Sequence, residues 1–123
     1  MGTHVMRKFN NVNELVNILK PEYPVYCIRL QSIKTSVEFF KKNFTGKVLY
    51  AVKTNPNEKI LKSIVDNGIK NFDVASINEV KLVKKIDPKV KIYFMHTIKN
   101  RESIKEAYYR YSVKDFALDS KDE

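Results

Sequence analysis

A repeat of short apolar segments, each followed by a stretch of helical periodicity, constrains the fold of this 123-residue chain more than any other feature. The apolar segments are centred on Tyr50, Phe72, Tyr93 and Ala117, so successive centres lie 22, 21 and 24 residues apart. Between them, apolar residues recur at the three- and four-residue spacing of an amphipathic helix. Alternation of strand and helix is typical of a parallel sheet covered by helices, so we expect an α/β fold with about four βα units.

Three helical stretches separate these strands, and two of them have clear stop signals. The first has its apolar face in Ile60–Val65 and precedes Gly68, a natural C-terminal cap. The second has its apolar face in Val80–Ile86 and ends at Asp87-Pro88, and the third spans Ile104–Tyr111. The pattern therefore predicts helices that each lay one apolar face on the sheet.

Two architectures use such units, the closed (β/α)8 barrel and the doubly wound open sheet. No glycine-rich turn follows the first strand, so the dinucleotide-binding fingerprint is missing and the barrel is favoured. Four strands are present, and residues 119–123 resemble the opening turn of a further helix, with Ser120 as N-cap and Glu123 as its partner. We therefore expect the N-terminal part of a TIM (β/α)8 barrel, truncated from a longer protein.

The first 30 residues do not follow the repeat. Residues 1–5 look like a vector-derived leader, and residues 6–30 form a separate segment before the partial barrel of residues 31–123. A helix is predicted at 11–19, with Asn11 and Glu14 as a capping pair.

The segment Pro24–Leu30 reads as a strand, and residues 32–43 return to helical period. Cys27, the single cysteine of the chain, lies inside this apolar run and is expected to fill the core. One cysteine excludes an internal disulfide and agrees with a reducing cytoplasm.

The first strand of the repeat ends unusually. Val48–Val52 is an unbroken apolar run, typical of a strand buried on both faces, yet Lys53 follows it and Asn55-Pro56 then stops the strand. Ligands gather at the carboxyl ends of parallel strands. A lysine amine that partial desolvation makes neutral can attack a carbonyl and form a Schiff base, which is how proteins usually hold pyridoxal phosphate. A solvated surface lysine is the alternative interpretation.

Three motifs in this order carry a resemblance: Tyr50-Ala51-Val52-Lys53-x-Asn55, Phe72-Asp73-Val74-Ala75-Ser76-x-x-Glu79 and Phe116-x-x-Asp119-Ser120-x-x-Glu123. Together they resemble the pyridoxal-phosphate decarboxylases of the ornithine and diaminopimelate type, whose barrel is shared with alanine racemase. The resemblance runs from about Pro24 to Glu123. It implies that Lys53 binds pyridoxal phosphate covalently, and that the segment before the barrel contributes a strand to a separate β-domain.

The resemblance also assigns cofactor-binding residues. Asp73 ends the second strand and is expected beside Lys53, and Ala51 belongs to the lysine motif. Glu79 is placed at the edge of the cofactor, although Ser76-x-x-Glu79 also forms a capping box for the next helix. His96 follows the third strand where many relatives carry asparagine, so its imidazole contacts cofactor or substrate, or hydrogen-bonds within its loop.

Asp119 matches a family aspartate that supports the strand-to-helix turn, and no catalytic role is expected for it. The resemblance draws the phosphate loop and the substrate-binding acids from outside these 123 residues. No metal ligand set is expected.

The implied activity is decarboxylation of a basic amino acid by a cytoplasmic enzyme that forms a homodimer. Ornithine is the first expectation, with putrescine and polyamine synthesis as its context, because Phe72–Ser76 and Met95–Lys99 look most like bacterial ornithine or lysine decarboxylases. Lysine or diaminopimelate is the alternative substrate. The fragment alone is expected to be inactive, and a half-barrel that acts as a non-enzymatic interaction module is the alternative from another class.

The net charge of +9 would suit a nucleic-acid partner. The lysines, however, are spread along the chain among acidic residues, as in Lys81–Asp87, and they form no block beside stacking aromatics. Nucleic acid is therefore not an expected partner. No apolar run approaches the roughly 20 residues of a membrane span, so no membrane association is expected either.

Overall fold

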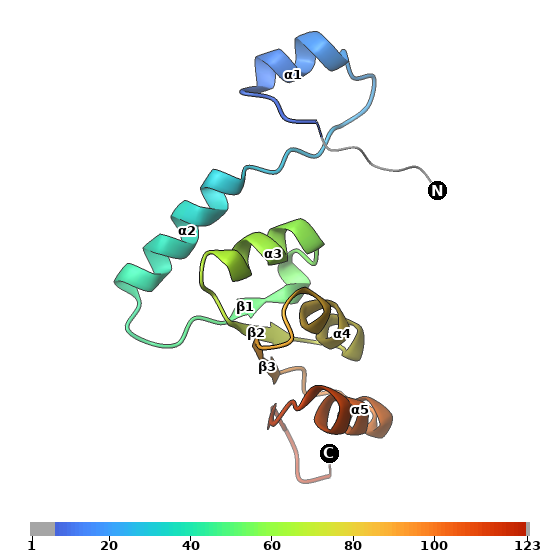
Figure 1. The fold of residues 1–123 in the computed structure, drawn as a ribbon. Helices are drawn as coiled ribbons and strands as arrows, with labels where there is room; N and C mark the ends of the chain where they lie inside the picture. The colour runs from blue at the N-terminus through green and yellow to red at the C-terminus, as the bar shows by residue number, and fades with distance from the viewer. Residues whose placement is uncertain (1–6, 123) are drawn as a thin grey trace.

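The computed structural model describes residues 7–122, in which helices cover one face of a parallel four-stranded sheet (Figure 1). The strands lie in the order β1-β2-β3-β4, and each pairs in parallel with the next. The predicted alternation of strand and helix is confirmed. The repeat consists of β1 (Tyr50–Ala51), α3 (Glu58–Asp66), β2 (Asn71–Val74), α4 (Ile77–Ile86), β3 (Lys91–Phe94), α5 (Arg101–Tyr111) and β4 (Asp115–Phe116).

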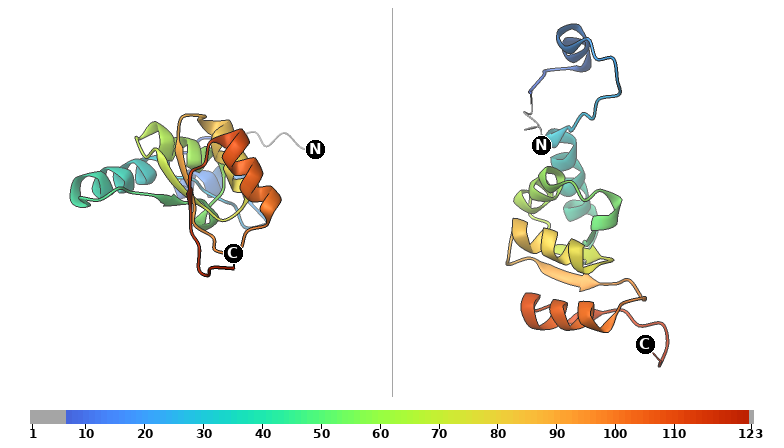
Figure 2. Two further views of the ribbon diagram at one scale, coloured as in Figure 1. Left: turned by 90° about the horizontal axis from the view of Figure 1, so that it is seen from below. Right: turned by 90° about the vertical axis from the view of Figure 1, so that its right-hand side faces the viewer.

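The core lies between the sheet and the helices α3, α4 and α5 (Figure 2). Alternate residues of β2, Phe72 and Val74, are fully buried, while Asp73 between them is half-exposed on the other face. This period of two is what a strand with one covered face requires. The buried apolar side chains are Val37, Val52, Leu61, Ile64, Val65, Ile69, Phe72, Val74, Val80, Val83, Val90, Ile92, Phe94, Ala107 and Val113.

The first strand is shorter than predicted. Only Tyr50–Ala51 pairs with β2, and Val52–Thr54 forms a 3₁₀ turn, η1. Val52 is fully buried, but Tyr50 and Ala51 are only half-buried. The expectation of burial on both faces was wrong here, because β1 is the first strand of the described sheet and its other face is uncovered.

A glycine ends α3 as predicted. Gly68 has a φ of +101°, and its N–H donates to Val65 O at 3.0 Å while the N–H of Ile69 donates to Ile64 O at 3.2 Å. These two bonds form a Schellman motif, which satisfies carbonyls that the helix itself leaves open.

We expect Gly68→Ala to destabilise the protein by about 1–2 kcal/mol, because a side chain at this positive φ is strained. Thermal unfolding of the full-length protein measures the loss. Gly46→Ala is the matched control, since the close neighbour of an added Cβ at that position is the ring of the exposed Phe44. An equal loss from both substitutions would contradict the assignment.

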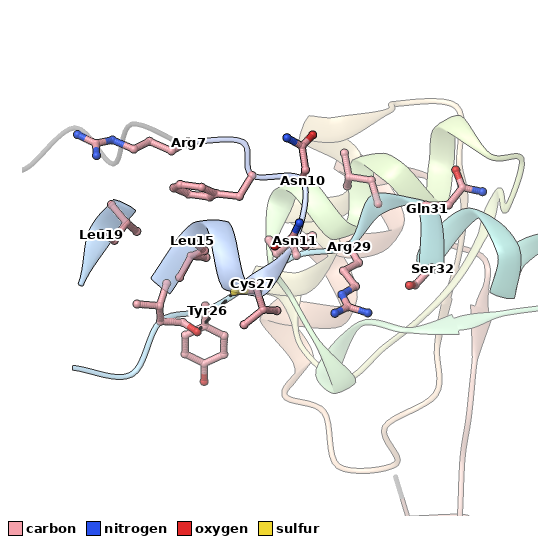
Figure 3. A pocket seen from close by; sticks show the side chains of 15 residues that line it. Arg7, Asn10, Asn11, Leu15, Leu19, Tyr26, Cys27, Arg29, Gln31 and Ser32 are labelled. Atoms are coloured by element: carbon pink, nitrogen blue, oxygen red, sulfur yellow. Dashed lines mark hydrogen bonds between the residues drawn. The ribbon is translucent and has the colours of Figure 1, made fainter. Parts of the chain in front are cut away.

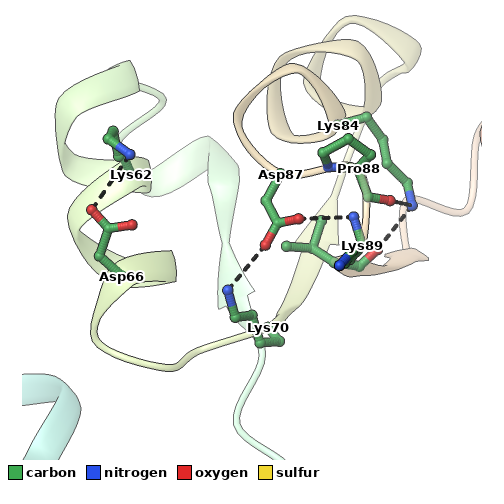
Figure 4. Close-up of polar contacts among 8 residues, drawn as sticks. Lys62, Asp66, Lys70, Lys84, Asp87, Pro88 and Lys89 are labelled. Atoms are coloured by element: carbon green, nitrogen blue, oxygen red, sulfur yellow. Dashed lines mark hydrogen bonds and ion pairs between the residues drawn. The ribbon is translucent and has the colours of Figure 1, made fainter.

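Hydrogen bonds and an ion pair from Asp87 and neighbouring lysines stabilise the turn between α4 and β3 (Figure 4). Asp87 accepts from the backbone N–H of Lys89 at 2.9 Å and pairs with Lys70 at 3.0 Å, and these contacts lower the pKa of its carboxyl. Lys84 Nζ donates to the carbonyls of Pro88 and Val90, both at 2.9 Å, and burial lowers the pKa of this amine. The predicted stop at Asp87-Pro88 is confirmed.

Two helices precede the sheet. Helix α1 (Val12–Leu19) is capped by Asn11, whose side chain accepts from the N–H of Glu14 at 2.9 Å, as predicted. The carboxylate of Glu14 reaches back to the N–H of Asn10 at 2.6 Å. Helix α2 (Leu30–Asn43) packs beside α3 through the buried Val37, whereas α1 lies away from the sheet (Figures 1 and 2).

The predicted strand at Pro24–Leu30 is not observed. The segment runs without strand pairing into α2, which begins at Leu30, and it lines a hollow of about 720 Å³ next to α1 (Figure 3). Tyr26 is fully exposed, and Cys27 is exposed rather than a core residue, so both predictions were wrong. An apolar run forms a strand only where a neighbouring strand accepts its hydrogen bonds, and no strand of the described sheet lies beside it.

The proposed leader at 1–5 and Glu123 lie outside the described residues. The expected helical turn at the far end is described only as bends over 119–121. Within residues 7–122, no helix has the length and apolar character needed to cross a membrane.

Candidate functional site

The parallel register brings the carboxyl ends of the first three strands to one edge of the sheet. Ala51 lies opposite Asp73, and Asp73 lies opposite Tyr93. The residues that follow these positions therefore emerge side by side. Six of them line a hollow of about 260 Å³: Lys53, Asp73, Ala75, Met95, His96 and Thr97. The structure thus brings Lys53 and Asp73 together, as the sequence predicted, and adds His96 to the same hollow.

Lys53 is held at this edge by its neighbours. The preceding Val52 is fully buried under the helices, so the turn η1 is anchored and directs the exposed Lys53 outward. The hydroxyl of Tyr50 donates to Asn55 O at 3.3 Å, and the side chain of Asn55 accepts from the N–H of Asn57 at 3.2 Å. These contacts order the loop after the lysine.

His96 carries its ring in a defined orientation. The backbone N–H of Ile98 donates to His96 Nδ1 at 3.1 Å. A backbone N–H only donates, so Nδ1 is the acceptor and the proton of the neutral ring lies on Nε2. The loop hydrogen bond, one of the two alternatives raised by the sequence, is therefore observed at Nδ1. His96 also lines the hollow, and its contact with cofactor or substrate stays a prediction.

Glu79 makes the contacts of a helix cap. Its carboxylate accepts from the N–H of Ala75 at 2.8 Å, and its own N–H donates to the side chain of Ser76 at 3.2 Å. The predicted capping box is confirmed, with the return bond shifted by one residue to Ala75. Glu79 is not among the residues that line the hollow, so its contact with the cofactor stays a prediction.

We expect Glu79→Gln to weaken cofactor binding, as the contact implied by the resemblance requires, and to cost at most about 0.5 kcal/mol of stability, because the amide oxygen still accepts from the N–H of Ala75. Glu79→Ala and the control Ser76→Ala should each cost about 1 kcal/mol, the usual loss of an N-terminal cap. Thermal unfolding and cofactor titration of the full-length protein separate the roles. Unchanged cofactor affinity in Glu79→Gln would contradict the predicted contact and leave Glu79 as a helix cap alone.

Two other sequence assignments lie elsewhere. Ala51 lines a separate apolar hollow of about 480 Å³ beside α2, and its contact with the cofactor stays a prediction. Asp119 lies in the bends after β4, where the sequence had placed a scaffolding aspartate. Within residues 7–122, no three histidine, cysteine, aspartate or glutamate side chains come together as a metal ion would require.

Sequence reasoning missed Lys99. Its Nζ donates to the carbonyls of His96 and Thr97, both at 2.8 Å, and of Ala117 at 2.7 Å. Its neighbours in the sequence gave no sign of this, because the contact to Ala117 spans 18 residues and depends on β3 and β4 lying side by side.

A polar cluster lies on the uncovered face of the sheet. Lys47 Nζ donates to the hydroxyl of Tyr93 at 3.0 Å, which lowers the pKa of that hydroxyl. Lys91 pairs with Asp115 at 3.0 Å and lies 4.7 Å above the Tyr93 ring. The hydrogen bond to Asp115 raises the pKa of the Lys91 amine. The uncovered face is therefore polar, unlike the face that the helices cover.

A parallel βα sheet with an amine, a carboxylate and an imidazole around one hollow at its carboxyl edge has the arrangement of an α/β ligand-binding domain. The sequence model of the pyridoxal-dependent decarboxylases, for their pyridoxal binding domain, matches residues 30–123. The chain therefore belongs to the pyridoxal-dependent decarboxylase family, and the predicted resemblance, fold and cofactor, pyridoxal phosphate, are confirmed. A comparison with curated protein sequences finds no match.

Solved structures agree with this assignment. The ornithine decarboxylase of Entamoeba histolytica is 31% identical, with a TM-score of 0.69 over 76% of this chain and 27% of its own. The arginine decarboxylase of Paramecium bursaria Chlorella virus is 30% identical, with a TM-score of 0.77 over 86% of this chain and 29% of its own. The lysine decarboxylase of Selenomonas ruminantium, at 23% identity and a TM-score of 0.79 over 95% of this chain and 31% of its own, shares the fold. The chain spans less than a third of each relative.

Proposed function

We propose that the full-length protein decarboxylates a basic amino acid, ornithine first, with pyridoxal phosphate anchored at Lys53. The observation that carries this proposal is the shared hollow of Lys53, Asp73 and His96 within a matched pyridoxal binding domain. The donor set suits the cofactor, because a primary amine is the group that binds an aldehyde. When bound, pyridoxal phosphate accepts the electron pair released as carbon dioxide leaves.

Each residue of the hollow has a separate task in this proposal. Lys53 would supply the amine that holds the aldehyde carbon of the cofactor. Asp73 lines the same hollow, and its carboxylate would balance a positive charge on the nitrogen of Lys53. His96 offers Nε2–H to an acceptor atom, because its Nδ1 is occupied by the N–H of Ile98.

The remaining parts of the site are proposed to come from the rest of the full-length protein. This chain spans about 27–32% of the solved relatives, so the groups that hold the phosphate and select the substrate are expected outside it. The Chlorella virus arginine decarboxylase has also been solved with agmatine, which supports a basic amino acid as the substrate class. A cytoplasmic homodimer remains part of the proposal.

Borohydride reduction of the full-length protein with pyridoxal phosphate should attach the cofactor at Lys53, as peptide mass spectrometry would show. Lys53→Ala should abolish both the attachment and turnover while leaving thermal stability nearly unchanged, because the side chain is exposed. The exposed Lys59 on α3 provides the control, since Lys59→Ala should keep both properties. Attachment at another lysine would overturn the assignment.

The substrate is tested by carbon dioxide release from ornithine, lysine, arginine and diaminopimelate. We expect the highest kcat/KM with ornithine, at least about tenfold above the value for each other substrate. A site that fits the side-chain length of ornithine would misplace the terminal charged group of a longer substrate and so bind its transition state more weakly. A higher value with any other substrate would replace ornithine in the proposal. No release from any of the four would refute decarboxylation.

A further inference from the structure

Lys99 ties the loop after β3 to the end of β4. Its ammonium donates to three backbone carbonyls, two in its own loop, at His96 and Thr97, and one at Ala117. The N–H of Ala117 donates in turn to Phe94 O at 3.1 Å, so this residue continues the pairing of β4 with β3. The lysine therefore fastens a loop to an edge of the sheet that is already fixed.

The fastened loop is one wall of the hollow. His96 and Thr97 are two of the six residues that line it, together with Lys53 and Asp73. Hydrogen bonds to a charged donor are the stronger kind, and this ammonium is half-buried, so the carbonyls are held firmly. Lys99 itself does not line the hollow.

Two contacts together fix the imidazole of His96. Lys99 holds the carbonyl of His96, and the N–H of Ile98 holds its Nδ1 at 3.1 Å. With the backbone and one ring nitrogen fixed, Nε2–H has a defined direction. Without Lys99, the His96 ring would keep its hydrogen bond to Ile98. The loop itself would no longer be fixed, so the position of the ring relative to Lys53 would change.

We propose that Lys99 is a positioning residue, which acts through His96 by fixing the Nε2–H donor against the bound cofactor. This inference rests on the proposed function, because it assumes that pyridoxal phosphate occupies the hollow beside Lys53. Lys99 contributes no reacting atom, and its effect on the cofactor passes through the loop that it holds.

The competing explanation is that Lys99 only stabilises the fold. Lys84 offers a matched comparison, because it also donates to two carbonyls of a loop, those of Pro88 and Val90, but at the opposite end of β3 (Figure 4). A purely structural role would make the two lysines equivalent. A positioning role makes only Lys99 affect the cofactor.

A double-mutant cycle in the full-length protein tests the proposal. The dissociation constant of pyridoxal phosphate is measured by fluorescence titration of the cofactor-free protein, and thermal unfolding is followed in parallel. Lys99→Met and His96→Ala should each weaken binding about tenfold, the loss of one well-placed hydrogen bond. The double variant should be weakened about tenfold as well, because both changes remove the same contact.

Two further variants complete the test. Lys99→Arg, which keeps a charged multiple donor, should bind within about threefold of the original protein. Lys84→Met should lower the melting temperature as much as Lys99→Met while changing cofactor affinity less than about twofold.

Additive losses, near a hundredfold in the double variant, would overturn the proposal, and so would an unchanged affinity in Lys99→Met or His96→Ala. These outcomes differ from failure of the proposed function itself, in which the unsubstituted protein would bind no pyridoxal phosphate.

Discussion

The parallel register of β1, β2 and β3 is the constraint on which the rest of the structure depends. Because Ala51 lies opposite Asp73 and Asp73 opposite Tyr93, the strands end at one edge and their following residues meet there. The helices on the other face hold this register by burying Phe72, Val74 and Phe94. The candidate site is therefore built by strand pairing, although most of its lining residues belong to loops and turns.

Contacts of neighbouring residues hold the backbone of the loops that form the site. Val52 is buried directly before Lys53, and the capping bonds of Ser76 and Glu79 order the loop after β2. The carbonyl bonds of Lys99 do the same for the loop after β3. Each loop of the hollow is thus held by a side chain that does not itself line the hollow, while Lys53 and His96 do line it.

Local pattern was enough to predict the repeat, the caps at Asn11, Ser76 and Gly68, and the meeting of Lys53 with Asp73. Each depends on residues close in sequence or on the general geometry of parallel strands. Pro24–Leu30 and Lys99 could not be predicted, because their states depend on distant partners. The first has no partner strand among residues 7–122, and the second bonds from the loop after β3 to Ala117 at the end of the neighbouring β4. Short-range periodicity carries no information about either.

The polar cluster on the uncovered face also constrains the register in which the strands pair. A slip of one residue would turn Lys91, Tyr93 and Asp115 toward the helices, where they would lose their partners among buried apolar side chains. Lys47 donates to Tyr93 across β2, and Lys91 pairs with Asp115 on the neighbouring strand, so both contacts exist in one alignment. The charged face therefore favours the same strand register as the apolar face, and that register places Lys53 at the sheet edge.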